Sequence, residues 1–273
     1  MESKPTARTS DGPRDIAVTR SSNVVTIRFD RPKVLNAFRA STRAQLAGTL
    51  ADLLEDRDAR VVILTGSGRA FSAGQDLNEL EARLDAEEEE DAGRGLEELQ
   101  ELTRALLALP QVTIAALNGV AVGLGAELAL ACDLRLAASS ASIGFPEARR
   151  AMFQTNGVMW LLPRIVGHAR ASELVLTGRI ASAIDAERIG LVHAVHADSE
   201  LDSAAAAVAA EITANAPASL ALAKALLRDT WGLGLEAVMK RESEGMLACL
   251  GSQDLREGNQ AFLEKRAPVY YGR

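Results

Sequence analysis

The sequence predicts an α/β fold with a helical C-terminal region. Segments typical of strands and of helices alternate to about residue 200, which is the pattern of helices layered on a largely parallel sheet. From Leu201 onward the pattern is helical throughout. We therefore expect a disordered tail at residues 1–14, an α/β core at 15–200 and a helical C-terminal region at 201–273.

The composition argues against several classes of protein. Hydrophobic residues make up 48% of the 273-residue chain and charged residues 25%, which is typical of globular proteins with a sizeable core. A net charge of −7 gives no broad basic surface for nucleic acid or anionic membranes. No apolar run approaches the roughly 18 residues of a membrane span, and the start lacks a signal core. Two cysteines without CxxC spacing predict no metal site and a reducing, cytoplasmic location.

The first predicted elements are a hairpin, a helix and a buried strand. Alternation over 16–19 and 24–29 predicts a β-hairpin. Ser41 is the predicted N-cap of the helix that follows. One face of this helix carries four leucines, Leu46, Leu50, Leu53 and Leu54. The unbroken apolar run at 61–64 predicts a strand that is buried on both faces.

A short loop at 70–77 follows, and two of its residues, Ala73 and Gly74, lack bulk. A ligand could therefore approach their backbone closely, although a tight turn between a strand and a helix explains them equally well. The acidic run at 87–91 is interpreted as a solvated helix surface or a mobile insertion rather than a metal site. A helix at 96–109 and a strand at 112–117 come next.

The central stretch at 115–147 predicts a catalytic site. The turn Gly123-Leu124-Gly125 precedes an apolar helix expected to begin near Glu127. Backbone N–H groups and the positive end of a helix dipole would meet there and could hold negative charge on an oxygen. Glu127 and Glu147 both stand in mostly apolar sequence, where a carboxyl group needs a partner, a solvated cavity or a function. The stretch predicts acid–base chemistry beside an oxyanion site.

The remaining elements are mostly helical. Ser182 begins a short capped helix that precedes a strand at 191–195. The C-terminal helices are expected at 201–215, 217–228, 235–250 and 253–265. Four other reactive side chains are interpreted as structural or surface groups: His168, His193, His196 and Cys132.

Five segments together carry a family resemblance. They are RPKVLNAF at 31–38, FSAGQDL at 71–77, NGVAVGLGAELALACDLRLA at 118–137, FPE at 145–147 and EGNQAFLEKR at 257–266. In this order and spacing they resemble the crotonase superfamily, the enoyl-CoA hydratase/isomerase family, over nearly the whole chain. The resemblance implies a spiral of ββα turns with a C-terminal helical trimerisation region, and trimers that commonly pair into hexamers.

The resemblance also implies an acyl-CoA thioester substrate and no separate cofactor, since coenzyme A is part of the substrate. It assigns acid–base roles to Glu127 and Glu147, and it places the thioester oxygen on the N–H groups of Ala73 and Leu124. The matching substrate and coenzyme A contacts are Lys33, Val34, Leu35, Gly74, Gln75, Asp76, Leu77, Phe262 and Lys265.

The chain departs from the family pattern at two places. Leu124 stands in the middle of what is often a run of three glycines, where its side chain would narrow the acyl pocket. Thr155 stands where the hydratases have a glycine that positions the reacting water. Three nearby side chains are expected either to line a pocket for a bulky acyl chain or to belong to the core: Phe153, Met159 and Trp160.

Three functions remain open at this point. The first is an enoyl-CoA hydratase that adds water to a trans-2-enoyl-CoA, with Glu127 and Glu147 sharing the acid and base roles. The second is a Δ3-Δ2 enoyl-CoA isomerase that moves one proton, chiefly with Glu147. The third is an acyl-CoA-binding paralogue with little hydratase activity.

Overall fold

The computed structural model describes residues 14–85 and 89–272. The side chains of residues 83–92, and with them the interpretation of the acidic run, lie outside the described part.

Two sheets form the core of the fold. The larger sheet has the order β1 (Ile16–Ser21), β2 (Val24–Phe29), β3 (Val61–Gly66), β5 (Val112–Leu117), β7 (Leu134–Ala138) and β10 (Ala194–His196). The smaller has the order β4 (Ala70–Ser72), β6 (Val120–Val122), β8 (Ser142–Gly144) and β9 (Ile180–Ser182).

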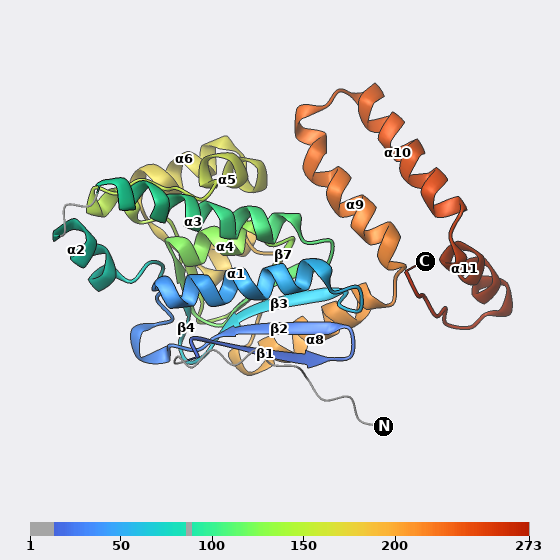
Figure 1. Cartoon of the computed structure of the whole chain (residues 1–273), viewed down its shortest axis with the longest axis horizontal. Coiled ribbons are helices and arrows are strands. Elements are labelled where there is room, and N and C mark those ends of the chain that lie inside the picture. Colours follow the sequence, from blue (N-terminus) through green and yellow to red (C-terminus); the bar gives the residue numbers. More distant parts are fainter. Residues whose placement is uncertain (1–13, 86–88, 273) are drawn as a thin grey trace.

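The chain spirals between the two sheets. Three successive turns each place one strand in the large sheet and the next strand in the small sheet, and then form a helix. They are β3–β4 with α2 (Leu77–Asp85) and α3 (Glu89–Ala108), β5–β6 with α4 (Leu124–Ala131), and β7–β8 with η2 (Glu147–Arg150), α5 (Val158–Val166) and α6 (His168–Thr177). The expected spiral of ββα turns is confirmed (Figure 1).

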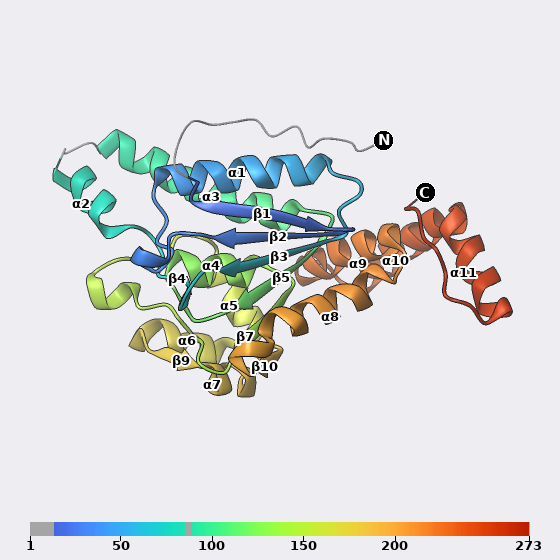
Figure 2. The ribbon, with the colours of Figure 1, turned by 90° about the horizontal axis from the view of Figure 1, so that it is seen from below.

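Helices cover both faces of the large sheet. Figure 2 shows α1 (Ala40–Glu55) and α3 on one face and α8 (Leu201–Thr213) on the other. Every residue of β3 is buried, as expected for a strand that is covered on both sides. Three buried rings, Phe29, Phe38 and Phe71, pack edge to face with centroid distances of 4.9 and 5.2 Å.

The start of α1 differs from the prediction. The helix begins at Ala40 with Arg39 as its N-cap residue. Ser41 is not the cap, because its hydroxyl donates to Asp15 Oδ2 at 2.6 Å and so ties the helix to the first strand. The predicted apolar face is also one residue too wide, since Leu54 is 48% exposed.

Two other boundaries shift. The strand expected at 191–195 is β10, Ala194–His196, because the N–H groups of Leu191 and Val192 both turn back to Ala186 O on α7 (Ala183–Arg188). The helix expected near Glu127 begins at Leu124. The N-cap at Ser182 is confirmed, since its hydroxyl oxygen accepts from Asp185 N–H at 3.1 Å.

The helical C-terminal region consists of two differently placed parts. Helix α8 buries Leu201, Ala205 and Ala209 and belongs to the core. Three helices, α9 (Pro217–Asp229), α10 (Leu235–Leu250) and α11 (Gln253–Glu264), extend from the body (Figure 1). Lys224 anchors α9, because its Nζ lies 2.7 Å from both Gln111 O and Asp133 Oδ2. The chain is helical from Leu201 onward as expected, and the part that extends from the body begins after α8.

Within the described ranges, no single helix is long and apolar enough to cross a membrane. One bent pair, Asp198–Thr213 with Pro217–Gly232, meets that length and composition only jointly, with a bend of 105°.

Candidate active site

The topology of the small sheet gathers the candidate site. Strands β4, β6 and β8 are parallel neighbours, so their carboxyl ends meet at one edge. The loop that starts at Ala73 follows β4, the turn at Gly123 follows β6, and Glu147 comes shortly after β8. These three segments lie far apart in the sequence, and the spiral makes them one surface.

The expected role of the Ala73 N–H group is wrong. This group donates to Leu35 O at 2.9 Å, so it is already used inside the fold. The acceptor is presented by a left-handed bend, in which Leu35 has φ 53° and Asn36 has φ 57°. An N–H group held this way cannot also serve as a donor to a substrate oxygen.

Another N–H group of the same loop is available. Asp76 N–H donates to Phe38 O at 2.9 Å, and Gly74 N–H donates to Ser72 Oγ at 3.1 Å. Among the described residues Gln75 N–H has no such acceptor, and Gln75 lines the pocket. Gln75 therefore replaces Ala73 as the candidate donor from this loop.

The N-terminus of α4 supplies the second donor. Leu124 is the first residue of the helix, and the preceding Gly123 has φ 54° and no side-chain cap. Leu124 N–H, like the other first-turn amides of a helix, has no partner within the helix. A methyl group on Gly74 would lie 3.3 Å from Leu124 N and 2.9 Å from Val122 O, so the two loops are in direct contact. The backbone N–H groups of Gln75 and Leu124 therefore lie on either side of one position in the pocket, where they could both donate to an oxyanion.

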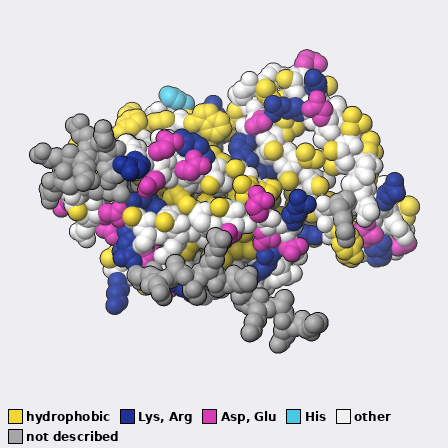
Figure 3. Space-filling model, in the orientation of Figure 1, with side chains coloured by type: hydrophobic (Ala, Val, Ile, Leu, Met, Phe, Trp, Pro, Cys, Tyr) yellow, Lys and Arg dark blue, Asp and Glu magenta, His cyan; other side chains and the backbone are white. Residues whose placement is uncertain are grey.

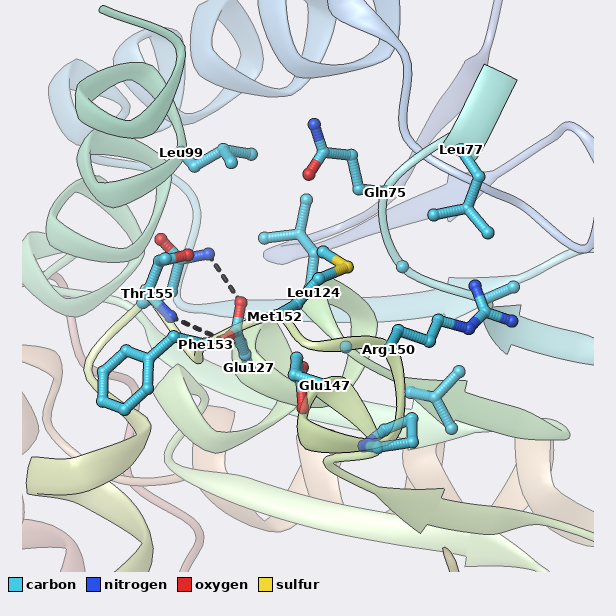
Figure 4. Close-up of a pocket in the computed structure, with 16 residues that line it drawn as sticks. Gln75, Leu77, Leu99, Leu124, Glu127, Glu147, Arg150, Met152, Phe153 and Thr155 are labelled. Atoms are coloured by element: carbon cyan, nitrogen blue, oxygen red, sulfur yellow. Dashed lines mark hydrogen bonds between the residues drawn. The ribbon is translucent and has the colours of Figure 1, made fainter. Parts of the chain in front are cut away.

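Glu127 is a buried carboxylate held by Asn156 and Thr155. It is 3% exposed, and its Oε2 accepts from Asn156 Nδ2 at 2.7 Å while its Oε1 accepts from Thr155 N–H at 3.3 Å. Burial raises the pKa of Glu127, the hydrogen bond from Asn156 opposes that rise, and the negative charge of Glu147 adds to it. Figure 4 shows Glu127 and Glu147 side by side at the base of the pocket.

Glu147 has fewer donors. It is 8% exposed and stands at the first position of η2. Its Oε2 accepts from Gln154 Nε2 at 3.1 Å. Burial raises the pKa of Glu147, and its own backbone N–H group and the Gln154 amide oppose that rise. The two predicted carboxyl groups therefore share one pocket, each with a raised pKa, which is the arrangement that acid–base chemistry near neutral pH requires.

The pocket combines this polar base with apolar walls. It encloses about 670 Å³, including its open mouth. Its apolar lining comes from Leu77, Leu99, Val122, Leu124, Pro146, Met152 and Phe153. Leu124 does border the pocket, as expected. Phe153, Met159 and Trp160 were expected to line either the pocket or the core. Phe153 lines the pocket and is 72% exposed, whereas Met159 and Trp160 belong to neither.

Sequence reasoning missed two site residues, Gln154 and Asn156. Both carboxamides are buried, at 6% and 1% exposure, and both belong to the loop that departs from the family pattern. A signal was present in the sequence, since the polar run Gln154-Thr155-Asn156 interrupts apolar sequence directly before a helix. The run alone did not reveal which groups the amides would contact.

The predicted coenzyme A contacts are not all near the pocket. Lys33 and Val34 lie on the exposed turn η1 (Pro32–Val34), and the next residue, Leu35, contacts the Ala73 loop. Phe262 is 83% exposed on α11, and Lys265 is that helix's C-cap residue. Within one chain α11 lies at the far end of the molecule from α2 and the pocket (Figure 1).

The histidines and Cys132 take no part in the pocket. His193 Nδ1 accepts from Arg135 N–H at 3.1 Å, and Cys132 is buried in the core, where burial raises the pKa of its thiol to about 12. No group of three or more His, Cys, Asp or Glu side chains able to hold a metal occurs in the part of the chain that the structure describes.

Replacement of Glu127 by glutamine is expected to stabilise the protein at alkaline pH. Folding raises the pKa of Glu127, so the unfolded carboxyl ionises first, and native stability falls as pH rises above the ordinary glutamate pKa. Glutamine has no such dependence. The melting temperature of Glu127→Gln should exceed that of the wild type at about pH 8, and the gap should close towards about pH 4. Exposed Glu55→Gln is the control, and an equal gap at both pH values would contradict the expectation.

A ββα spiral that holds two buried carboxylates beside two free backbone donors defines a class of acid–base enzyme that stabilises an oxyanion. The comparisons agree, and the chain belongs to the enoyl-CoA hydratase/isomerase family, whose model matches residues 19–273. It is a crotonase-superfamily enzyme.

The relatives cover nearly the whole chain. Human mitochondrial enoyl-CoA hydratase domain-containing protein 2 is 39% identical over 92% of this chain and 86% of its own length. The short-chain-enoyl-CoA hydratase of Clostridium acetobutylicum is 33% identical over 92% of this chain and 95% of its own. The crystal structure of enoyl-CoA hydratase from Bacillus anthracis superposes with a TM-score of 0.91 at 36% identity, and covers 95% of this chain and 100% of that one.

Proposed function

We propose that the protein is an enoyl-CoA hydratase, which adds water reversibly to a trans-2-enoyl-CoA. The observation that carries the proposal is that Glu127 and Glu147 lie together in one apolar pocket beside the N–H groups of Gln75 and Leu124, for which residues 14–85 and 89–272 offer no acceptor. Water addition needs a base for the water and an acid for the α-carbon. Family membership and the printed names of the relatives support the acyl-CoA thioester as substrate.

In the proposed mechanism the thioester oxygen accepts from Gln75 N–H and Leu124 N–H. These donors withdraw electron density and stabilise the enolate that forms, and such a donor is typically worth about 3 kcal/mol. Glu127 removes a proton from water as the water oxygen bonds to the β-carbon. Glu147, protonated at the start, delivers its proton to the α-carbon, and the two carboxyl groups then return to their initial states by exchange with solvent.

The hydrogen bonds support this division of roles. Glu127 accepts from a side-chain amide and a backbone amide, so its anion is the better stabilised of the two. Glu147 accepts from the Gln154 side-chain amide at a longer distance and from its own backbone N–H group, which is one donor fewer than Glu127 has, because the Asn156 backbone N–H group also donates to Glu127. We therefore assign the base to Glu127 and the acid to Glu147.

One observation favours the isomerase as the second candidate. The Thr155 N–H group stands where the hydratases have a glycine amide near the water. Here it donates to Glu127 Oε1 at 3.3 Å, so it is already used and is not free to hold a water. An isomerase needs no water and would use chiefly Glu147. The deciding experiment offers trans-2-enoyl-CoAs and 3-enoyl-CoAs, from short aliphatic to aromatic, and measures both the product mass and the absorbance of the conjugated enoyl thioester. A gain of one water supports the hydratase, whereas double-bond migration without mass change supports the isomerase, and binding without turnover supports the acyl-CoA-binding paralogue.

We further propose that the protein assembles as a trimer, or as a hexamer of two trimers, through its projecting helices. Helix α10 has no buried residue, and Figure 3 shows hydrophobic side chains spread over this part of the molecule. The most exposed are Leu227, Leu235, Leu247, Phe262 and Leu263. A neighbouring subunit would cover this surface, and α11 would bring Phe262 and Lys265 to a neighbour's coenzyme A.

The assembly is tested by mass in solution. We expect sedimentation equilibrium to give three or six times the chain mass of 28.9 kDa. The double variant Leu235→Asp with Leu247→Asp should shift the protein towards a single chain. Both leucines are exposed in the single chain, and the proposed partner would have to bury a carboxylate in place of each. A wild-type protein that is monomeric at micromolar concentration would contradict the proposal.

A further inference from the structure

The loop at 152–156 places one carboxamide on each carboxylate of the pocket. Asn156 Nδ2 lies 2.7 Å from Glu127 Oε2, and Gln154 Nε2 lies 3.1 Å from Glu147 Oε2. The two amides are two residues apart in the chain, and all four side chains are less than 9% exposed. The pairing is one to one, because neither amide contacts the other carboxylate.

The loop holds these amides firmly. Gln100 on α3 donates from Nε2 to Thr155 O at 3.2 Å. On the other side Gly157, with φ 77°, turns the chain into α5, whose first residue, Val158, is 1% exposed. The loop is therefore attached to α3 on one side and continues into α5 on the other, with both amides directed at the carboxylates.

One end of the Asn156 amide is used by Glu127, since Nδ2 donates to Glu127 Oε2 at 2.7 Å. Oδ1 of Asn156 is buried and has no hydrogen-bond partner among the described residues. When Glu127 is ionised, the opposite orientation of the amide is unfavourable, because it would place Oδ1 against a carboxylate oxygen.

Few charges compete with these amides. The charged group that acts on Glu127 is Glu147, and the other charged side chain on the pocket wall is Arg150, at the mouth in Figure 4. Leu99 on α3 and Leu124 on α4 are apolar residues of the same pocket wall. A neutral amide donor in such surroundings strongly favours the ionised form of the carboxyl group that it contacts.

We infer that Asn156 and Gln154 are positioning residues that each set the proton affinity of one carboxylate, Asn156 for Glu127 and Gln154 for Glu147. This inference rests on the proposed function for its kinetic consequence, because the two carboxylates control opposite limbs of the pH profile. With Glu127 as base, loss of its donor moves the acid limb upward. With Glu147 as acid, loss of its donor moves the basic limb upward.

The experiment compares pH profiles of kcat/KM for Asn156→Ala and Gln154→Ala. We expect Asn156→Ala to raise the acid limb alone by about one to two pH units, and Gln154→Ala to raise the basic limb alone by a similar amount or less. Below its acid limb Asn156→Ala should lose about 10- to 100-fold in kcat/KM, and it should recover most of this loss at higher pH. Asn156→Asp, which keeps the shape but adds a second carboxyl group, should move the acid limb further.

Control variants separate a positioning role of the two amides from a general loss of activity. Asn215→Ala, at an exposed site far from the pocket, should leave both limbs unchanged. A uniform loss of rate at all pH values in Asn156→Ala and Asn156→Asp, with both limbs fixed, would overturn the inference. If each variant moves one limb but the two limbs are exchanged, the inference stands and the assignment of Glu127 as base fails.

A second measurement needs no substrate. The gain in melting temperature from Glu127→Gln at about pH 8 reports the cost of the buried carboxylate. This gain should be larger in the Asn156→Ala background than in the wild type, and unchanged in the Gln154→Ala background. Equal gains in all three backgrounds, or a larger gain in the Gln154→Ala background, would overturn the inference even if water addition is confirmed. A larger gain in the Asn156→Ala background alone would support it even if the enzyme proves not to be a hydratase.

Discussion

Replacement of either Glu127 or Glu147 by glutamine is expected to lower kcat for water addition by about 10²- to 10⁴-fold, the range typical of a lost general acid or base. Glutamine keeps the shape of the side chain and an acceptor for Asn156 or Gln154, so the pocket should remain closed. The loss should therefore lie in kcat rather than in KM. The measurement is loss of the enoyl-thioester absorbance, with the product checked for the mass of one added water.

The two substitutions discriminate between the candidate functions. A hydratase needs both carboxyl groups, and both variants should be equally unable to add water at an appreciable rate. An isomerase needs chiefly Glu147, so Glu127→Gln would retain most of its activity. Glu55→Gln on the exposed end of α1 is the matched control and should act like the wild type. Full water addition by Glu127→Gln would exclude the proposed mechanism.

Much of the fold could be predicted from local sequence patterns. Alternation identified the hairpin β1–β2, and the unbroken apolar run identified β3, which is buried along its whole length. Burial alternates along β2 as predicted, whereas β1 is buried only at its first residue, Ile16. The position of α8 could not be predicted in this way, because an alanine-rich helix has the same pattern whether it covers the sheet or projects from it.

The candidate site was predictable where it depends on residue type. Glu127 and Glu147 are carboxyl groups in apolar sequence, and the structure brings both into one pocket. The donor from the Ala73 loop was not predictable in this way. Which N–H group of that loop is free depends on Leu35 O, which is presented by a left-handed bend almost 40 residues earlier in the chain. Such non-local hydrogen bonds leave no periodic signal.

Because Ala73 N–H is already bonded to Leu35 O, the candidate donor of this loop is the backbone of Gln75. If the free donor is the Gln75 backbone N–H group, the Gln75 side chain is not needed for oxyanion binding, and backbone donors survive side-chain changes. The same holds for Leu124, where only a residue without an N–H group removes the donor. Proline is the one such residue.

Leu124→Pro is therefore expected to lower kcat by about 10²- to 10³-fold relative to Leu124→Ala, the loss typical of one oxyanion donor. Leu124 is the first residue of α4, a position that favours proline, because the N–H group there takes part in no bond of the helix. Both variants lose the same buried side chain, which is 5% exposed, so they should widen the acyl wall and lose stability alike. Matching melting temperatures would show that the fold survives in both. Equal kcat values for the two variants would exclude Leu124 N–H from the reaction. A deficit in kcat confined to the proline variant, with KM unchanged, would support a donor role for the end of this helix, because a proline Cδ that simply blocked the substrate oxygen would also raise KM.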